Sequence, residues 1–121
     1  MTAVTSKDNP KIKQVRALLA QRKARDTSGL FVAEGIRHVG EACASGAKVE
    51  YICYCPQSLT SPFAQELVRQ QEQNDIPCLA VSQQVFNRLA DKDNPAGLLA
   101  VVHQPKLTLE DLDLDMFHKG V

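Results

Sequence analysis

The chain has 121 residues, enough for one domain with a single hydrophobic core and too few for two ordinary domains or a large barrel enzyme. Hydrophobic residues make up 44% and charged residues 23%, which is typical of a folded globular protein and excludes a disordered or fibrous one. The formal net charge is zero, no apolar run approaches the roughly 20 residues of a membrane span, and no secretory signal begins the chain, so we expect a cytoplasmic protein without a membrane partner.

The first expected element is a basic helix over residues 10–25. Asn9 is a good N-cap, and Pro10 fits the first helical position, where a missing N–H is not needed. Residues 1–40 carry eight Lys and Arg against three Asp and Glu, a net charge of +5 that the rest of the chain offsets. This asymmetry indicates a basic surface for a phosphate-bearing partner, although a solvated charged helix would explain the charge alone equally well.

Strands and helices then alternate along the chain. Hydrophobic periodicity and turn residues predict strands over residues 30–33, 49–55, 77–81 and 98–102, and helices over residues 34–45, 62–73 and 82–89. In the helix over 62–73, Phe63 is expected to face inward. This order predicts an α/β fold in which helices cover both faces of a mostly parallel sheet.

The cysteines could form two disulfides, a zinc site or a set of buried thiols. Their positions are Cys43, Cys53, Cys55 and Cys78. No C-x-x-C pair occurs, and the three histidines form no ligand pair with the cysteines. Cys53 and Cys55 would point to the same face of one strand, so the spacing favours buried thiols and no metal site.

No known catalytic motif is recognisable in the chain. A glycine-rich nucleotide loop, a P-loop, a nucleophile elbow and a zinc-protease motif are all missing from the sequence. Glu34, at the end of a predicted strand, could act as a catalytic carboxylate, but such a residue more often caps the following helix. The pattern indicates a binding domain, followed over residues 105–121 by an acidic linker in which leucine alternates with acid.

Four stretches together carry a resemblance to a known family. They are residues 5–13 (TSKDNPKIK), 22–25 (RKAR), 29–37 (GLFVAEGIR) and 94–102 (NPAGLLAVV). In this order they resemble the N-terminal substrate-binding domain of the SpoU (TrmH) family of RNA 2'-O-ribose methyltransferases. The similarity is greatest to the subgroup with an extra basic N-terminal helix, which includes 23S rRNA methyltransferases.

The resemblance implies a ribosomal-protein L30e-like fold, a three-layer α/β/α sandwich with a four-stranded mostly parallel or mixed sheet. It divides the chain into a basic N-terminal helical extension (1–25), an L30e-like RNA-binding domain (26–104) and an acidic linker (105–121). A SPOUT catalytic domain, which binds S-adenosylmethionine in a trefoil knot and forms a homodimer, would follow the linker. The family's catalytic motifs lie there, so no catalytic, cofactor or metal residue is carried over to this chain.

The resemblance also places RNA contacts at loops along one end of the sandwich, here the Glu34–Gly35 turn and the loop over residues 93–97. Gly35 would let the RNA backbone approach, and Arg37 would form a forked contact with a phosphate. The basic first helix would add phosphate contacts that do not depend on sequence. The full set of expected RNA-binding residues is Lys7, Asn9, Lys11, Lys13, Arg16, Arg22, Lys23, Arg25, Glu34, Gly35, Arg37 and Asn94.

The expected function is RNA recognition for an S-adenosylmethionine-dependent RNA 2'-O-methyltransferase, with 23S rRNA as the first candidate substrate and tRNA as the second. One alternative is a stand-alone L7Ae-type RNA-binding protein without catalysis. Another is a structural role in holding a dimer together. The methyltransferase domain and the stand-alone RNA-binding protein can be distinguished by whether the reading frame continues into the catalytic motifs.

Overall fold

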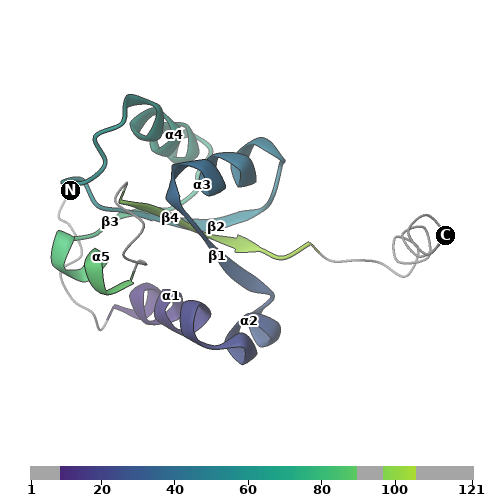
Figure 1. Cartoon of the computed structure of the whole chain (residues 1–121). Coiled ribbons are helices and arrows are strands. Elements are labelled where there is room, and N and C mark those ends of the chain that lie inside the picture. Colours follow the sequence, from purple (N-terminus) through teal and green to yellow (C-terminus); the bar gives the residue numbers. More distant parts are fainter. Residues whose placement is uncertain (1–8, 90–96, 106–121) are drawn as a thin grey trace.

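The computed structural model describes residues 9–89 and 97–105, which form a four-stranded sheet between two layers of helices (Figure 1). The elements are α1 (Pro10–Ala20), α2 (Arg22–Ser28), β1 (Leu30–Glu34), α3 (Gly35–Ala44), β2 (Val49–Tyr54), α4 (Pro62–Gln73), β3 (Cys78–Ala80), α5 (Gln83–Leu89) and β4 (Leu98–His103). The predicted alternation of helices and strands is confirmed. Over the described ranges, every helix is too short or too polar to cross a lipid bilayer.

The last strand along the chain, β4, lies inside the sheet, whose order is β1-β4-β2-β3. It runs antiparallel to both neighbours, whereas β2 and β3 are parallel. The predicted mixed sheet is confirmed, and the mostly parallel sheet is wrong. The Val81 N–H donates to the Tyr54 carbonyl (2.7 Å) and the Cys55 N–H to the Gly97 carbonyl (2.8 Å). The connection from β3 to β4 therefore begins and ends at the same end of β2, and β4 must run back.

Side chains of β4 enter two hydrophobic cores, one on each face of the sheet. Leu99 and Val101 belong to the α1/α5 core, which also contains buried residues of α1 and α5. Leu98, Ala100 and Val102 belong to the α3/α4 core on the other face. All five are completely buried. Burial of each larger side chain stabilises the fold by about 1.5–3 kcal/mol, so both helical layers depend on this strand.

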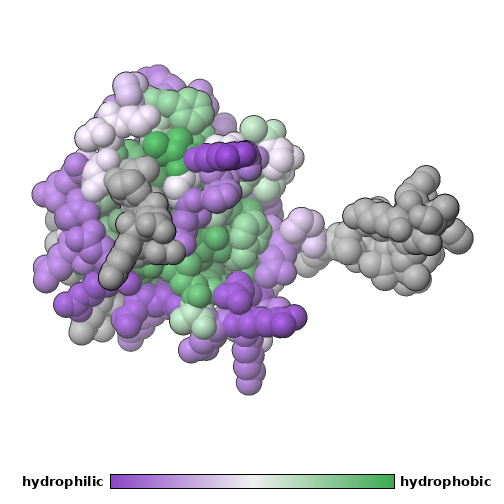
Figure 2. Space-filling view, in the orientation of Figure 1, coloured by the Kyte–Doolittle hydropathy of each residue, from purple (hydrophilic) through white to green (hydrophobic). Residues whose placement is uncertain are grey.

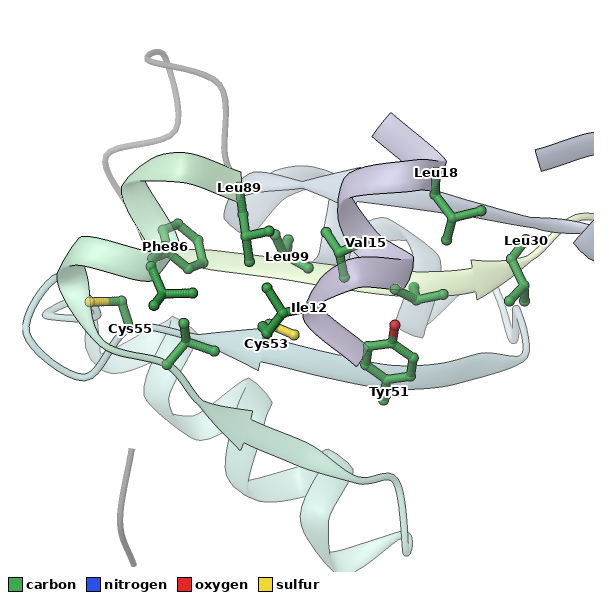
Figure 3. Close-up of a cluster of buried hydrophobic side chains, with 13 residues drawn as sticks. Ile12, Val15, Leu18, Leu30, Tyr51, Cys53, Cys55, Phe86, Leu89 and Leu99 are labelled. Carbon is green, nitrogen blue, oxygen red and sulfur yellow. The ribbon is translucent and has the colours of Figure 1, made fainter. Parts of the chain in front are cut away.

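The basic helix α1 is held against the sheet by one apolar face and one tyrosine. Ile12, Val15 and Leu18 point into the α1/α5 core (Figure 3). The Tyr51 hydroxyl of β2 donates to Gln14 Oε1 of α1 at 2.7 Å. Burial raises the pKa of Tyr51 well above its ordinary value, so the hydroxyl keeps the proton that it donates.

The structure replaces the single helix predicted over residues 10–25 with α1 and α2. Gln21 separates them in an extended backbone conformation (φ −127°, ψ 117°). An unbroken helix of this length would span about 24 Å, whereas the chain must turn back to enter the sheet at Leu30. The Arg25 guanidinium donates to the Leu18 carbonyl oxygen at 2.7 Å and satisfies an acceptor at the break.

The prediction that Phe63 faces inward is wrong. Its side chain is 63% exposed, and its ring lies beside Gly40 of α3. The inward face of α4 is formed instead by Ala64, Leu67 and Val68. Because successive helical residues are rotated by about 100°, a position directly before this stripe points away from the core.

Gly97 is required where β4 starts. Its φ is +71°, and a Cβ added there would lie 2.7 Å from Ser58 Cβ and 3.2 Å from the Cys55 carbonyl oxygen. We expect Gly97→Ala to lower the free energy of unfolding by about 3 kcal/mol, because a left-handed backbone and a steric clash act together. Urea unfolding monitored by circular dichroism measures this change.

Gly29→Ala is the matched control for this substitution. Gly29 has nearly the same φ, +72°, but an added Cβ would meet nothing within 4 Å. The expected loss is about 1–2 kcal/mol, from the backbone conformation alone. Equal losses in the two variants would contradict the close packing of Gly97 against β2 and the segment that follows it.

Candidate functional site

The loops predicted to bind RNA lie at one end of the sheet, where β1, β2 and β3 end and β4 begins. Glu34, the last residue of β1, pairs in register with Leu99, the second residue of β4. The Glu34–Gly35 turn and the described end of the second predicted loop, Gly97, therefore lie at the same end. Asn94, from that loop, and Lys7, from the N-terminus, are outside the described residues.

The Glu34–Gly35 turn leads directly into α3. Gly35 adopts a φ of +91°, and Glu34 occupies the N-cap position of α3. Arg37, in the first turn of α3, points to solvent, and its Nε lies 3.2 Å from Glu41 Oε1. An exposed ion pair of this kind contributes little to stability, so Arg37 can exchange Glu41 for a phosphate at small cost.

An open hollow of about 790 Å³ extends from this turn along β1 and α3. Its lining residues are Phe31, Val32, Ala33, Glu34, Gly35, His38, Glu41, Ala42, Ser45, Ala47, His103 and Pro105. Figure 2 shows hydrophobic side chains on this face, between the hydrophilic surfaces of the two helical layers. The lining is largely apolar, and its polar side chains include the carboxylates of Glu34 and Glu41 and the imidazoles of His38 and His103.

The sequence analysis missed this hollow because it depends on the order of the strands. Of its lining residues, only Glu34 and Gly35 were among the predicted contacts. The hollow forms because β1 is an edge strand of the described sheet, with β4 on its other side. Strand order follows from long-range pairing, so no local pattern around residues 30–34 indicates it.

Of the RNA contacts predicted in α1, its N-cap and α2, some are bonded within the fold and others are exposed to solvent. Two of them act within the fold: Asn9 Oδ1 accepts from the Lys11 N–H at 2.9 Å as the cap of α1, and the Arg25 guanidinium bonds to a carbonyl oxygen of α1. Lys11 Nζ lies 4.6 Å from the centre of the Tyr51 ring. Arg22 pairs with Asp26 at 3.7 Å in an exposed ion pair.

The remaining predicted cations, Lys13, Arg16 and Lys23, are exposed on α1 and α2. Lys13 and Arg16 lie on α1, which packs on the opposite face of the sheet from α3, the helix that the Glu34–Gly35 turn begins. Lys23 lies on α2, which ends before the first residue of β1, whereas the turn follows the last. Five strand residues span roughly 16 Å. The predicted contacts thus form two groups: the end-loop group (Glu34, Gly35, Arg37) and the basic-helix group (Lys13, Arg16, Lys23).

All four cysteines are free thiols, in agreement with the sequence. Cys53 and Cys55 are fully buried in the α1/α5 core, and the predicted common face is confirmed. Cys43 and Cys78 pack against the α3/α4 core. Burial raises the pKa of Cys53 and of Cys78 to about 12, so neither is a thiolate at neutral pH.

Comparison with known proteins supplies the family. The chain matches the MRM3-like substrate binding domain over residues 9–100, well over half of its length. The chain belongs to this family. The match includes the Glu34–Gly35 turn, α1 and α5, so both groups of candidate contacts are parts of the MRM3-like domain itself.

The relatives of this MRM3-like domain are RNA methyltransferases. The 23S rRNA (uridine(2479)-2'-O)-methyltransferase of Streptomyces viridochromogenes is 32% identical over 111 residues, which are 91% of this chain and 36% of the relative. A solved RNA 2'-O ribose methyltransferase has a TM-score of 0.72 and 34% identity, and the match covers 89% of this chain and 40% of that one. The SpoU methyltransferase AviRb of S. viridochromogenes, solved with AdoMet, has a TM-score of 0.72 and 29% identity. That match covers 84% of this chain and 38% of AviRb.

These matches confirm the resemblance to the substrate-binding domain of the SpoU family. The chain spans 36% to 40% of the length of the three relatives.

The raised thiol pKa values predict slow labelling of the native cysteines. At pH 8, a pKa of about 12 leaves only about one thiol in ten thousand ionised, and the thiolate is the reactive form. We expect Cys53 and Cys78 to react with iodoacetamide far more slowly in the native chain than in guanidinium chloride, as measured by mass spectrometry. Equal rates in the two conditions would contradict the buried-thiol assignment.

Proposed function

We propose that this chain is the RNA-recognition domain of an S-adenosylmethionine-dependent RNA 2'-O-ribose methyltransferase. The observation that carries the proposal is the match to a substrate binding domain over residues 9–100. The named relatives act on 23S rRNA or RNA, which supports 23S rRNA as the first candidate and tRNA as the second. Because the chain matches little more than a third of these enzymes, the relatives favour this reading over a stand-alone L7Ae-type RNA-binding protein.

The proposal includes a longer, cytoplasmic protein. Residues 26–104 form an L30e-like body, residues 1–25 a basic extension whose described part packs on that body, and residues 105–121 a linker. A catalytic domain follows, binds S-adenosylmethionine and forms a homodimer. AdoMet in the solved relatives supports the choice of cofactor. No residue of this chain is assigned to the cofactor or to the chemical step.

In this proposal the basic-helix group and the end-loop group contact different parts of the RNA. A methyltransferase that acts on a ribose hydroxyl must select one nucleotide in a folded RNA. The basic-helix group contributes phosphate affinity that depends on salt and not on sequence. The end-loop group, with the adjoining hollow of about 790 Å³, offers apolar walls and carboxylate acceptors to an unstacked base.

Arg37→Gln tests the end-loop group. We expect it to weaken binding to transcribed 23S rRNA about tenfold, because one charge-assisted bond to a phosphate is lost. Fluorescence anisotropy at fixed salt measures the dissociation constant. Arg69→Gln is the matched control, because Arg69 is also an exposed arginine paired with a glutamate of its own helix, but it lies on α4.

The control should bind as the unmodified chain does. Failure of the unmodified chain to bind 23S rRNA and tRNA at low salt would contradict the proposed function. Equal weakening by both substitutions would contradict a specific role for Arg37 and leave only general attraction between charges.

A further inference from the structure

The six arginines of this chain differ in whether their side chains form an ion pair or a hydrogen bond within the protein. All six lie within the described residues, and four have a protein partner. Those pairs are Arg22 with Asp26, Arg25 with the Leu18 carbonyl, Arg37 with Glu41, and Arg69 with Glu66. For Arg16 and Arg88, the described part of the chain supplies neither an ion pair nor a hydrogen bond.

These two arginines line the same small hollow. It has a volume of about 260 Å³ and lies between α1 and α5, where Leu19, Ala20 and Leu89 complete its lining. Both helices pack on the α1/α5 core, where Val15 of α1 and Leu89 of α5 lie above the same strand (Figure 3). The fold therefore places two arginines from distant parts of the sequence at one hollow.

The positive surface continues along α1. A second hollow, of about 310 Å³, is lined by Lys13 and Arg16 together with Ala17, Ala20 and Gln21. Lys13 and Arg16 are three residues apart, so they lie on the same side of α1. No described Asp or Glu lines either hollow. Lys13, Arg16 and Arg88 thus line two adjoining hollows, and Arg16 belongs to both.

This arrangement suits an anion. Both guanidinium groups are positively charged at neutral pH, and no described acidic side chain lines the hollow that they share. The carbonyl end of α5 partly offsets the charge of Arg88, which lies in the last turn, whereas Arg16 lies within α1, away from its end. A phosphate between the two would offset both charges and accept forked bonds from both.

We propose that Arg16 and Arg88 hold one phosphate of the RNA backbone between α1 and α5, with Lys13 against the neighbouring phosphate. The inference rests on the proposed function for the identity of the ligand. A row of cations along a surface fits a polyanion better than a single ion, which favours the RNA backbone over free phosphate. Arg88 lies in the acidic part of the sequence, so charge patterning alone gave no reason to select it.

The test compares Arg16→Gln, Arg88→Gln and the double variant of the 121-residue chain. Binding to transcribed 23S rRNA is measured by fluorescence anisotropy over a range of salt concentrations. We expect each single substitution to weaken binding about tenfold. If the two arginines share one phosphate, the double variant loses much less than the product of the single losses.

The salt dependence of RNA binding gives a second measure of how many phosphates the arginines contact. The slope of log K against log salt changes by about 0.9 for each phosphate released from a duplex and about 0.7 for a single strand. One shared phosphate predicts that the double variant changes the slope by one such step. Arg69→Gln again serves as the control. Both side chains lack hydrogen bonds within the described structure, so thermal melting should be unchanged.

Three results would overturn the shared phosphate. The first is unchanged RNA binding by the double variant while Arg37→Gln still weakens it, which leaves the proposed function intact. The second is fully additive losses with a slope change of two steps. The third is saturation of the Arg16 and Arg88 Nε–H signals by micromolar inorganic phosphate in NMR spectra, which would identify a free-anion site. Absence of RNA binding by the unmodified chain would instead overturn the proposed function, and this inference with it.

Discussion

The structure depends on a single strand that must satisfy two cores at once. β4 separates β1 from β2, and its alternating side chains enter the α1/α5 core on one face and the α3/α4 core on the other. A polar residue at any of positions 98–102 would therefore be buried without a water contact. Both candidate surfaces rely on this strand, because it pairs with the end of β1 and supports the helices that carry the arginines.

Local chemistry was sufficient to predict most elements, and long-range pairing explains most of what was missed. Asn9 begins α1 as predicted, and Ser61 and Ser82 accept from the first turns of α4 and α5 in the same way, because an N-cap acts within three residues. The break at Gln21 and the direction of β4 depend on where the chain must return to the sheet. The site divides in the same way: basic patterning indicates α1, whereas the hollow along β1 and the approach of Arg88 to Arg16 follow only from strand order and helix packing.

A chain of zero net charge can still present a strongly positive surface. Here the acidic side chains Asp26, Glu41 and Glu66 each neutralise an arginine of their own helix. Within residues 9–89 and 97–105, such local pairs leave Arg16 and Arg88, at the boundary between α1 and α5, without an acidic partner. The electrostatic field that a polyanion would meet is therefore set by where the pairs form, and the overall charge balance says little about it.

The central position of β4 also affects the order in which the domain can assemble during synthesis. Its neighbours, β1 and β2, leave the ribosome first, but they do not pair with each other and must wait for the strand that joins them. Until residue 103 has emerged, both would expose unpaired edges and apolar side chains to water. The sheet can thus be completed only late in synthesis, because the strand that joins β1 to β2 is the last of the four along the chain.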